Sequence, residues 1–310
     1  MTDALPSLIV ITGPTAVGKT RLAIELAKIL SSEIISCDSR QFYKEMNIGV
    51  ARPSPKELNE VPHHMISFLS VADPYNAFRF EKEVLRLTEK LFRSNSKAIM
   101  VGGSGLYIHA VTHGIDELPD PDPELRLKLK ERLLREGIEA LQTELKRLDP
   151  HYFGTVDREN PKRLLRALEV CLTTGLPYSS LRKGQAAPRP FRTVRIGLNT
   201  DRMKLYERIN HRVDSMMQNG LLDEVRSLES YKELNALNTV GYKELFSFLE
   251  GKCSLEEAVE KIKTNTRRYA KRQLTWLKKD PEIRWFEPDE LEAILKYIEG
   301  DVMKHLASSI

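Results

Sequence analysis

The chain has 310 residues, 41% of them hydrophobic and 30% charged, which fits one large globular domain or a domain that carries an inserted module. No apolar run approaches the roughly 20 residues of a membrane helix, and the N-terminus lacks a signal-peptide pattern, so we expect a cytoplasmic protein that does not enter the membrane. The formal net charge is only +4, and Cys37, Cys171 and Cys253 are too scattered for a disulfide framework or a zinc ribbon.

The first part of the chain alternates between strand and helix patterns. Residues 8–11 (LIVI) predict a short buried strand, residues 20–30 a helix, and residues 33–38 (EIISCD) a second strand. A third strand is expected at residues 97–101 (KAIMV), directly before the glycines of VGGSG. Such alternation predicts an α/β fold with a parallel sheet and flanking helices.

The pattern changes at the linker DELPDPDPE (residues 116–124), after which residues 124–181 read as helices with breaks at Gly137 and Gly154. Strand character resumes at residues 192–198 and a further helix follows. We therefore predict a P-loop NTPase-like catalytic core from residues 1–115 and 196–310, interrupted by a helical insertion domain at residues 116–195.

A glycine-rich loop joins the first strand to the first helix. Its sequence GPTAVGKT matches G-x-x-x-x-G-K-[ST] in full, between a strand and a helix, and therefore predicts a phosphate cradle of backbone N–H groups. Lys19 is expected to reach the outer phosphates and the Thr20 hydroxyl to hold Mg²⁺. The loop comprises Gly13, Pro14, Thr15, Ala16, Val17, Gly18, Lys19 and Thr20. Which diphosphate it binds stays open at this point.

Asp38 follows the second strand, so it is expected at the carboxyl edge of the sheet, beside the loop. There it could hold Mg²⁺, take a proton from a nucleophile, or only cap the next helix. Gln41, Phe42 and Tyr43 could bind and stack a base, although such residues more often belong to the core. The third strand ends without an acid, which weakens an ATPase interpretation.

Basic residues gather in two runs, with five Lys/Arg and no acid at residues 179–200, and eight with one acid at residues 261–280. One run alone indicates a solvated face, but two favour a polyanionic partner. Lys162, Arg163 and Arg166 lie at helical spacing and could contact phosphates or only water. A zinc site at His109 and His113 is disfavoured because no third ligand is near in sequence.

From the residues alone, a small-molecule P-loop kinase and a non-catalytic RNA-binding NTPase remain alternatives to an RNA-modifying transferase. The kinase would explain the loop and Asp38 but not the basic runs. The RNA-binding NTPase would explain the basic runs but leave Asp38 without a role.

Seven motifs together resemble the bacterial tRNA dimethylallyltransferases, also called tRNA isopentenyltransferases. The motifs run in family order from residue 13 to residue 279: GPTAVGKT, CDSRQFYKEMNIGVARPS, VPHHMI, VGGSGLYI, NPKRLLRALEV, VGYKEL and TRRYAKRQLTWLKK. The resemblance implies transfer of a dimethylallyl group from dimethylallyl diphosphate to the exocyclic amine of the adenosine just 3′ of a tRNA anticodon. It also implies Mg²⁺ as cofactor and the anticodon stem-loop as partner, and we expect a monomer.

The resemblance also implies roles for individual residues. Asp38 would be the base that orients and deprotonates the amine, while Lys19, Thr20 and the rest of the loop, with Arg212, would hold the diphosphate. Ser104 replaces the family's usual Thr, and Asn238 and Lys243 stand where some relatives have Arg. The implied tRNA contacts are Asp38, Ser39, Arg40, Gln41, Ser104, Arg126, Lys162, Arg163, Leu164, Leu165, Arg166, Asn238, Thr239, Val240, Gly241, Tyr242 and Lys243.

Overall fold

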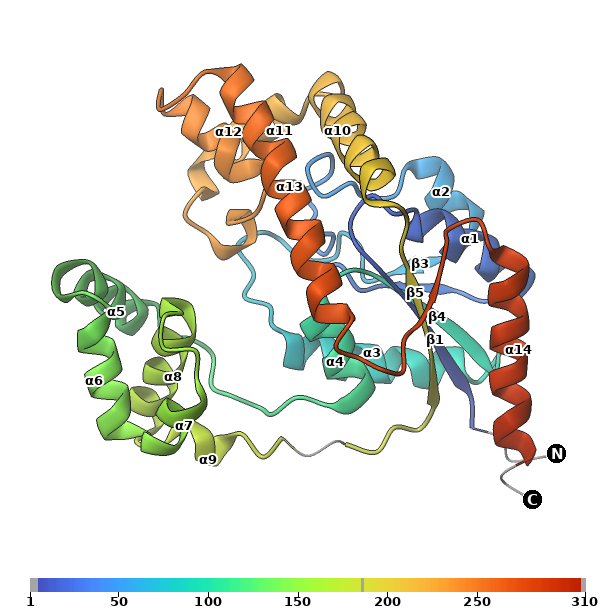
Figure 1. The fold of residues 1–310 in the computed structure, drawn as a ribbon, viewed down its shortest axis with the longest axis horizontal. Coiled ribbons are helices and arrows are strands. Elements are labelled where there is room, and N and C mark those ends of the chain that lie inside the picture. The colour runs from blue at the N-terminus through green and yellow to red at the C-terminus, as the bar shows by residue number, and fades with distance from the viewer. Residues whose placement is uncertain (1–4, 185–186, 308–310) are drawn as a thin grey trace. The chain divides into compact units, whose positions relative to one another are not determined.

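A six-stranded, fully parallel sheet forms the centre of the fold in the computed structural model, which describes residues 5–184 and 187–307 (Figure 1). The strand order is β3-β2-β4-β1-β5-β6. Their bounds are β1 Ser7–Thr12, β2 Ile34–Ser36, β3 His63–His64, β4 Lys97–Val101, β5 Arg192–Leu198 and β6 Arg284–Phe286. The predicted α/β class is confirmed, whereas β3 and β6 were missed because two or three residues are too few to show a period.

Both faces of the sheet are covered, as the buried strand patterns indicate. Leu8 and Val10 of β1 point into one core and Ile9 and Ile11 into the other, because successive strand residues face opposite sides. Helices α3 and α4 cover the first face, and α1, α10, α13 and α14 contribute to the second. The bounds are α1 Lys19–Ile29, α3 Ala77–Leu91, α4 Gly105–His113, α10 Arg202–Gln218, α13 Leu255–Leu277 and α14 Leu291–Ala307.

A second group of helices packs beside the sheet around a core of its own, which includes Tyr242, Leu245 and Ile262. It joins α11 (Leu221–Ser227) and α12 (Tyr242–Leu249) to parts of α10 and α13. The 3-10 turns Glu229–Tyr231 and Asn235–Leu237 connect α11 to α12, and the short helix α2 (Pro55–Glu60) follows the loop after β2. This arrangement brings residues from two halves of the sequence to one edge of the sheet.

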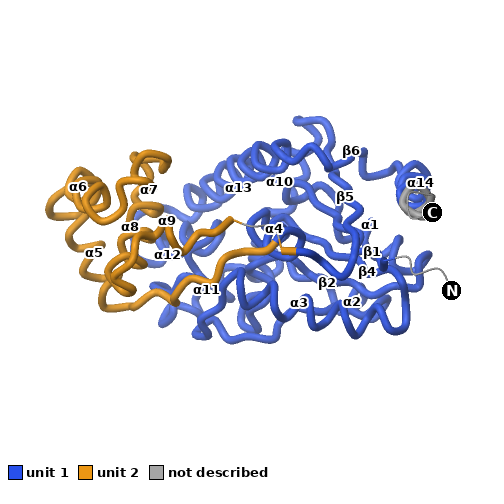
Figure 2. The backbone as a smooth tube through the Cα atoms, turned by 90° about the horizontal axis from the view of Figure 1, so that it is seen from below, with its two compact units in different colours: residues 1–113, 188–310 blue, residues 114–187 orange. Residues whose placement is uncertain are grey.

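The chain divides into two compact units, Met1–His113 with Pro188–Ile310 and Gly114–Ala187, which Figure 2 colours blue and orange. We call them the core unit and the helical unit. The predicted insertion limits, 116–195, differ from this division at the C-terminal side, where residue 195 lies inside β5. The extended residues before β5 belong to the core unit because Arg189 and Phe191 pack there.

The helical unit has a small core that includes Leu129, Leu141, Leu164 and Leu168. Its helices are α5 Pro123–Glu136, α6 Ile138–Leu148, α7 Pro150–Thr155, α8 Pro161–Thr174 and α9 Tyr178–Leu181. Asp122, Asp149 and Asn160 cap three of these helices, and a proline follows each cap, which is why α5, α7 and α8 begin where they do. Across the described residues, no helix is both long and apolar enough to cross a membrane.

Candidate active site

The glycine-rich loop has the backbone geometry of a phosphate cradle. Gly13 and Gly18 have φ angles of 147° and 109°, and Ala16 has a φ of 64°. A Cβ at Gly13 would lie 2.5 Å from the carbonyl oxygen of Leu198 at the end of β5. Glycine is therefore needed at position 13 both for conformation and for the close approach of two strand ends. The N-terminus of α1 faces the loop and adds a partial positive charge.

Two buried cations, Lys19 and Arg212, lie at the loop, and Asp38 is the carboxylate that acts on both. Lys19 Nζ donates to the carbonyl oxygens of Gly13 at 3.0 Å and Pro14 at 2.8 Å, and Arg212 donates to Thr15 Oγ1 at 3.3 Å. Burial lowers the pKa of Lys19 to about 8 against the opposing effect of Asp38, and the charge of Arg212 lowers it further. Burial also lowers the pKa of Arg212. A bound anion would offset the cost of burying the positive charges of Lys19 and Arg212, as a diphosphate site requires.

Gln273 joins the loop to its neighbours. Its side-chain oxygen accepts from the Thr15 N–H at 2.9 Å, and its Nε2 donates to the Gly103 carbonyl at 2.9 Å. A Cβ at Gly103 would stand 2.2 Å from that nitrogen, and one at Gly105 would stand 2.3 Å from the Trp276 ring. The glycines of VGGSG therefore allow α13 to approach the sheet edge closely.

Asp38 lies two residues beyond the end of β2, at the carboxyl edge of the sheet, as expected. Its Oδ1 accepts from the Arg40 N–H at 3.0 Å, which anchors the turn without using the second oxygen. Ser104 Oγ accepts from the Ser39 N–H at 3.1 Å and so ties this turn to the loop after β4. Asp38, Ser39 and Ser104 thus come together, although 65 residues separate the two serines.

One cavity of about 400 Å³ unites these elements within the core unit. Its wall includes the phosphate loop, Asp38, Gln41, Arg212, Tyr269 and Gln273. Phe42 and Tyr43, by contrast, are buried, and Phe42 stacks on Phe80 with ring centroids 5.3 Å apart. The suggestion that Phe42 and Tyr43 stack a base is therefore wrong, because these rings are core.

The oxygens at this cavity fit a divalent metal. Thr20, in the first turn of α1, and Asp38 both line it. In the part of the chain that the structure describes, no group of three or more His, Cys, Asp or Glu side chains could hold a metal. Mg²⁺ is commonly held by one or two protein oxygens with substrate phosphates and water, so the cavity suits that mode. The rings of His109 and His113 stack on each other with their centroids 4.6 Å apart.

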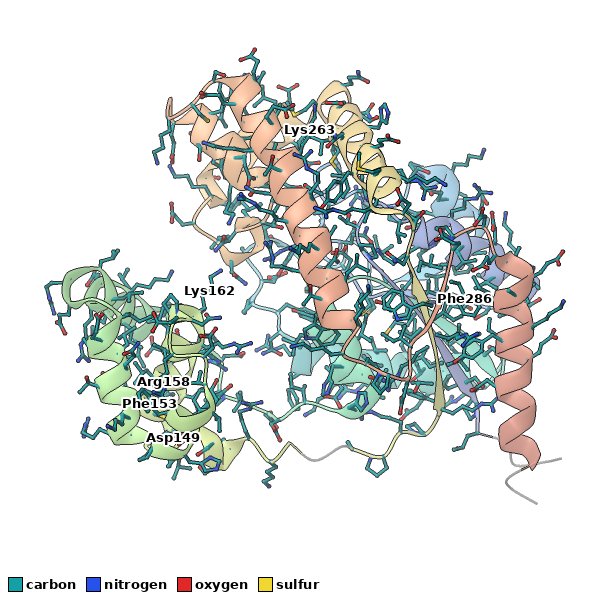
Figure 3. The ribbon with its side chains drawn as sticks, in the orientation of Figure 1. Asp149, Phe153, Arg158, Lys162, Lys263 and Phe286 are labelled. Carbon is teal, nitrogen blue, oxygen red and sulfur yellow. The ribbon has the colours of Figure 1, made fainter. Side chains whose placement is uncertain are left out.

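The predicted RNA contacts of the helical unit differ in how free their charges are. Lys162 and Arg163 are exposed at the start of α8, where Figure 3 labels Lys162. Arg126 forms a two-pronged ion pair with Glu169, one arm at 2.7 Å, and Arg166 lies 3.5 Å from the same carboxylate. Leu164 belongs to the core and its side chain cannot reach RNA, whereas Leu165 is half-buried.

The segment Asn238–Lys243 is equally mixed. Asn238 and Lys243 are exposed, Thr239 and Val240 are half-buried, and Gly241 and Tyr242 are buried. Tyr242 has no exposed area and donates its hydroxyl to Glu224 at 2.6 Å. Its side chain therefore supports the segment from below and does not contact RNA.

The two basic runs have different environments. Arg189 pairs with Glu81 at 2.5 Å and Arg195 with Asp280 at 2.6 Å, so these two cations of the run at 179–200 are neutralised inside the core unit. Arg182 and Lys183 of the same run are exposed. In α13, Lys263 pairs with Asp214 of α10 at 2.8 Å, and Figure 3 labels it on the side of α13 near α10. Arg268, Lys271 and Arg272 on the same helix are exposed.

Among the cavity residues that the sequence analysis did not identify are Arg208, Tyr269 and Gln273. Arg208 donates to the Val17 carbonyl at 3.2 Å and lies one helical turn before Arg212, so the i, i+4 spacing could have indicated it. Gln273 has no such signal, because its role depends on how α13 packs against the loop.

The chain is similar in sequence to known proteins. The chain matches the family described as IPP transferase over residues 41–280. It is 54% identical over 296 residues to the tRNA dimethylallyltransferase of Christiangramia forsetii, with 95% of this chain and 98% of that protein covered. Its identity to tRNA dimethylallyltransferase 1 of Bacteroides thetaiotaomicron is 48%, covering 98% and 99% of the two chains.

Solved structures agree in fold. The full-length tRNA isopentenylpyrophosphate transferase from Bacillus halodurans superposes with a TM-score of 0.71 at 35% identity, covering 96% of this chain and 97% of that one. A eukaryotic dimethylallyltransferase acting on tRNA gives a TM-score of 0.75 at 28% identity, covering 93% and 75%. With its P-loop NTPase-like sheet and this extent of similarity, the chain belongs to the IPP transferase family, whose members are tRNA-modifying enzymes.

Proposed function

We propose that this enzyme transfers a dimethylallyl group from dimethylallyl diphosphate to the exocyclic amine of the adenosine 3′-adjacent to the anticodon of tRNA. The observation that carries the proposal is the shared cavity, in which a phosphate loop and a carboxylate face the same space. The relatives named tRNA dimethylallyltransferase support this function over that of a small-molecule kinase.

In the proposed reaction the amine nitrogen attacks C1 of the allylic group, the C1–O bond breaks, and diphosphate leaves. Lys19, Arg212 and the loop N–H groups bind the charge that grows on the leaving oxygen. Asp38 accepts the proton from the amine and orients its lone pair. A divalent metal belongs to this family's chemistry, and we propose Mg²⁺ held by Thr20, which would neutralise the diphosphate.

RNA contacts are proposed for groups that are at least partly accessible: Gln41 at the cavity, Ser39 and Arg40 in the turn between Asp38 and Gln41, and Lys162, Arg163, Asn238 and Lys243 at the surface. The target adenosine must leave its stack to reach Asp38, which costs a few kcal/mol. Phosphate contacts along the anticodon stem would offset that cost. A monomeric state and a cytoplasmic location remain predictions.

The test uses purified protein, Mg²⁺ and an anticodon stem-loop RNA with labelled dimethylallyl diphosphate and no nucleotide. Label should move to the RNA, and Lys19→Ala should abolish the transfer while Lys19→Arg keeps a charge at the loop. ATP should compete weakly for the loop without being consumed. Transfer that requires ATP hydrolysis, or labelled γ-phosphate on a small acceptor, would establish a kinase instead.

A further inference from the structure

A carboxylate outside the cavity holds the chain segment that forms part of its wall. Glu224 of α11 accepts three successive backbone N–H groups, which belong to Asn47 at 3.0 Å, Ile48 at 2.7 Å and Gly49 at 3.0 Å. It also accepts the hydroxyl of Tyr242 at 2.6 Å. Four donors on one carboxylate form a strong, directional anchor, because hydrogen bonds to an ionised acceptor are about twice as strong as neutral ones.

The residues around Glu224 favour these hydrogen bonds. A Cβ at Gly49 would lie 2.6 Å from the Tyr242 ring, so only glycine lets the backbone reach the carboxylate past the tyrosine. Burial raises the pKa of Tyr242, and the neighbouring Glu224 raises it further, so the hydroxyl stays a donor at any working pH. Arg52 Nε also donates to Asn47 Oδ1 at 2.9 Å, which gives this chain segment a second hydrogen-bonded contact.

The anchored segment in turn holds Gln41. The carbonyl oxygens of Val50 and Ala51 accept from Gln41 Nε2 at 3.3 and 3.1 Å, and Gln41 Oε1 accepts from Ser36 Oγ at 3.0 Å. Ala51 has a φ of 47°, a left-handed conformation that an alanine adopts only when its neighbours impose it. Gln41, Val50 and Ala51 all line the cavity that contains Asp38.

We propose that Glu224 is a positioning residue that places Gln41 for the acceptor base by fixing the segment at residues 47–51. Because Tyr242 lies within Asn238–Lys243, the anchor also joins a proposed RNA-binding segment to the base pocket. The inference deepens the proposed function and rests on it. Glu224 itself does not line the cavity, so its effect must pass through the segment.

The central experiment compares Glu224→Gln with Asp223→Asn. Asp223 is the adjacent acid on α11, is exposed, and bonds only Arg226 among the described side chains. Glu224→Gln keeps the shape but removes the charge and turns an NH₂ toward backbone donors. We expect single-turnover transfer at saturating RNA and donor to fall roughly tenfold. Binding of dimethylallyl diphosphate should stay within twofold, and Asp223→Asn should match wild type.

Two further arms separate positioning from general damage. Hydrogen exchange at residues 47–51 should quicken in Glu224→Gln, and this measurement does not depend on transfer. In a Gln41→Ala background, Glu224→Gln should slow transfer little further, because the effect passes through Gln41. Tyr242→Phe is the milder variant if Glu224→Gln folds poorly, with the same pattern expected at smaller size.

Wild-type transfer rates in both Glu224→Gln and Tyr242→Phe would overturn the positioning role. So would a Glu224→Gln loss of transfer rate that is as large in the Gln41→Ala background as in the wild-type protein. Absence of transfer in the wild-type protein would instead contradict the proposed function. The exchange measurement would still decide whether the anchor holds the segment.

Discussion

The two arginine-rich stretches look alike in sequence and differ in what their charges contact. Around β5, Arg189 and Arg195 are only 8% and 6% exposed and each meets a carboxylate. On the outer face of α13, Arg268 and Arg272 are exposed, and in the part of the chain that the structure describes neither forms an ion pair. A run of basic residues therefore says where charge is, but not whether it is available to a partner.

The difference has a structural cause. Strand β5 lies between β1 and β6 in a sheet that is covered on both faces, so a cation on it, such as Arg195, must be paired to offset its loss of hydration. Helix α13 instead buries one side, through Ala270, Gln273 and Leu277, and leaves the other in water.

The first prediction compares the effects of substituting two aspartates, Asp38 in the cavity and Asp280 beside Arg195. Asp38→Asn removes the proposed base but keeps size and hydrogen bonding, so single-turnover transfer should fall roughly 10²–10⁴-fold with RNA affinity nearly kept. Asp280→Asn removes a partner of buried Arg195 and should lower the melting temperature, yet leave the rate of the folded enzyme near wild type. Rates within tenfold of wild type in Asp38→Asn would remove Asp38 from the chemistry.

Arg195→Ala should destabilise the fold by about 1–3 kcal/mol, because Asp280 and His113 each lose a hydrogen bond to the buried guanidinium. The matched exposed change, Arg272→Ala, should stay within about 0.5 kcal/mol of wild type. Urea unfolding of both variants measures this. Equal losses of unfolding free energy in Arg195→Ala and Arg272→Ala would mean that side-chain exposure does not explain the difference between the two basic stretches.

Lys19 predicts a pH dependence, since its pKa falls from the usual 10.5 to about 8 on folding. Between these values the unfolded chain binds the proton and the folded chain does not, so the Lys19 contribution to stability rises with pH and is lost as pH falls through 8. Donor binding needs the protonated form, so kcat/KM for dimethylallyl diphosphate should drop about tenfold per pH unit above 8. Lys19→Arg should remove that drop, and an unchanged profile in this variant would assign the titration elsewhere.

The smallest effect concerns salt. If Arg268 and Arg272 contact RNA phosphates, replacing either with Ala should reduce the slope of log affinity against log salt by about 0.7–0.9. Lys263→Ala, on the same helix but paired with Asp214, is the control and should leave the slope unchanged. Stem-loop binding across a salt series gives the result, and a similar change in all three variants would contradict the distinction.

Local patterns were sufficient for much of the fold and of the site. The glycines and lysine of GPTAVGKT, the strand before them and the helix after them depend on neighbouring residues, so the sequence alone predicted the loop. The position of Asp38 beside the loop was predicted because the carboxyl ends of parallel strands lie at the same edge of a sheet. The helical unit was visible because proline, glycine and capping residues mark its helix ends.

Long-range packing decided the rest. Whether Arg195 or Arg272 faces water, why Tyr242 is buried beneath a surface segment, and how Gln273 and Glu224 hold loops far from them in sequence all depend on elements that meet only in the folded chain. A side chain's hydration and its hydrogen-bond partners are properties of its three-dimensional neighbours. Periodicity and spacing report only on residues a few positions apart, so they predict elements and short motifs but not these pairings.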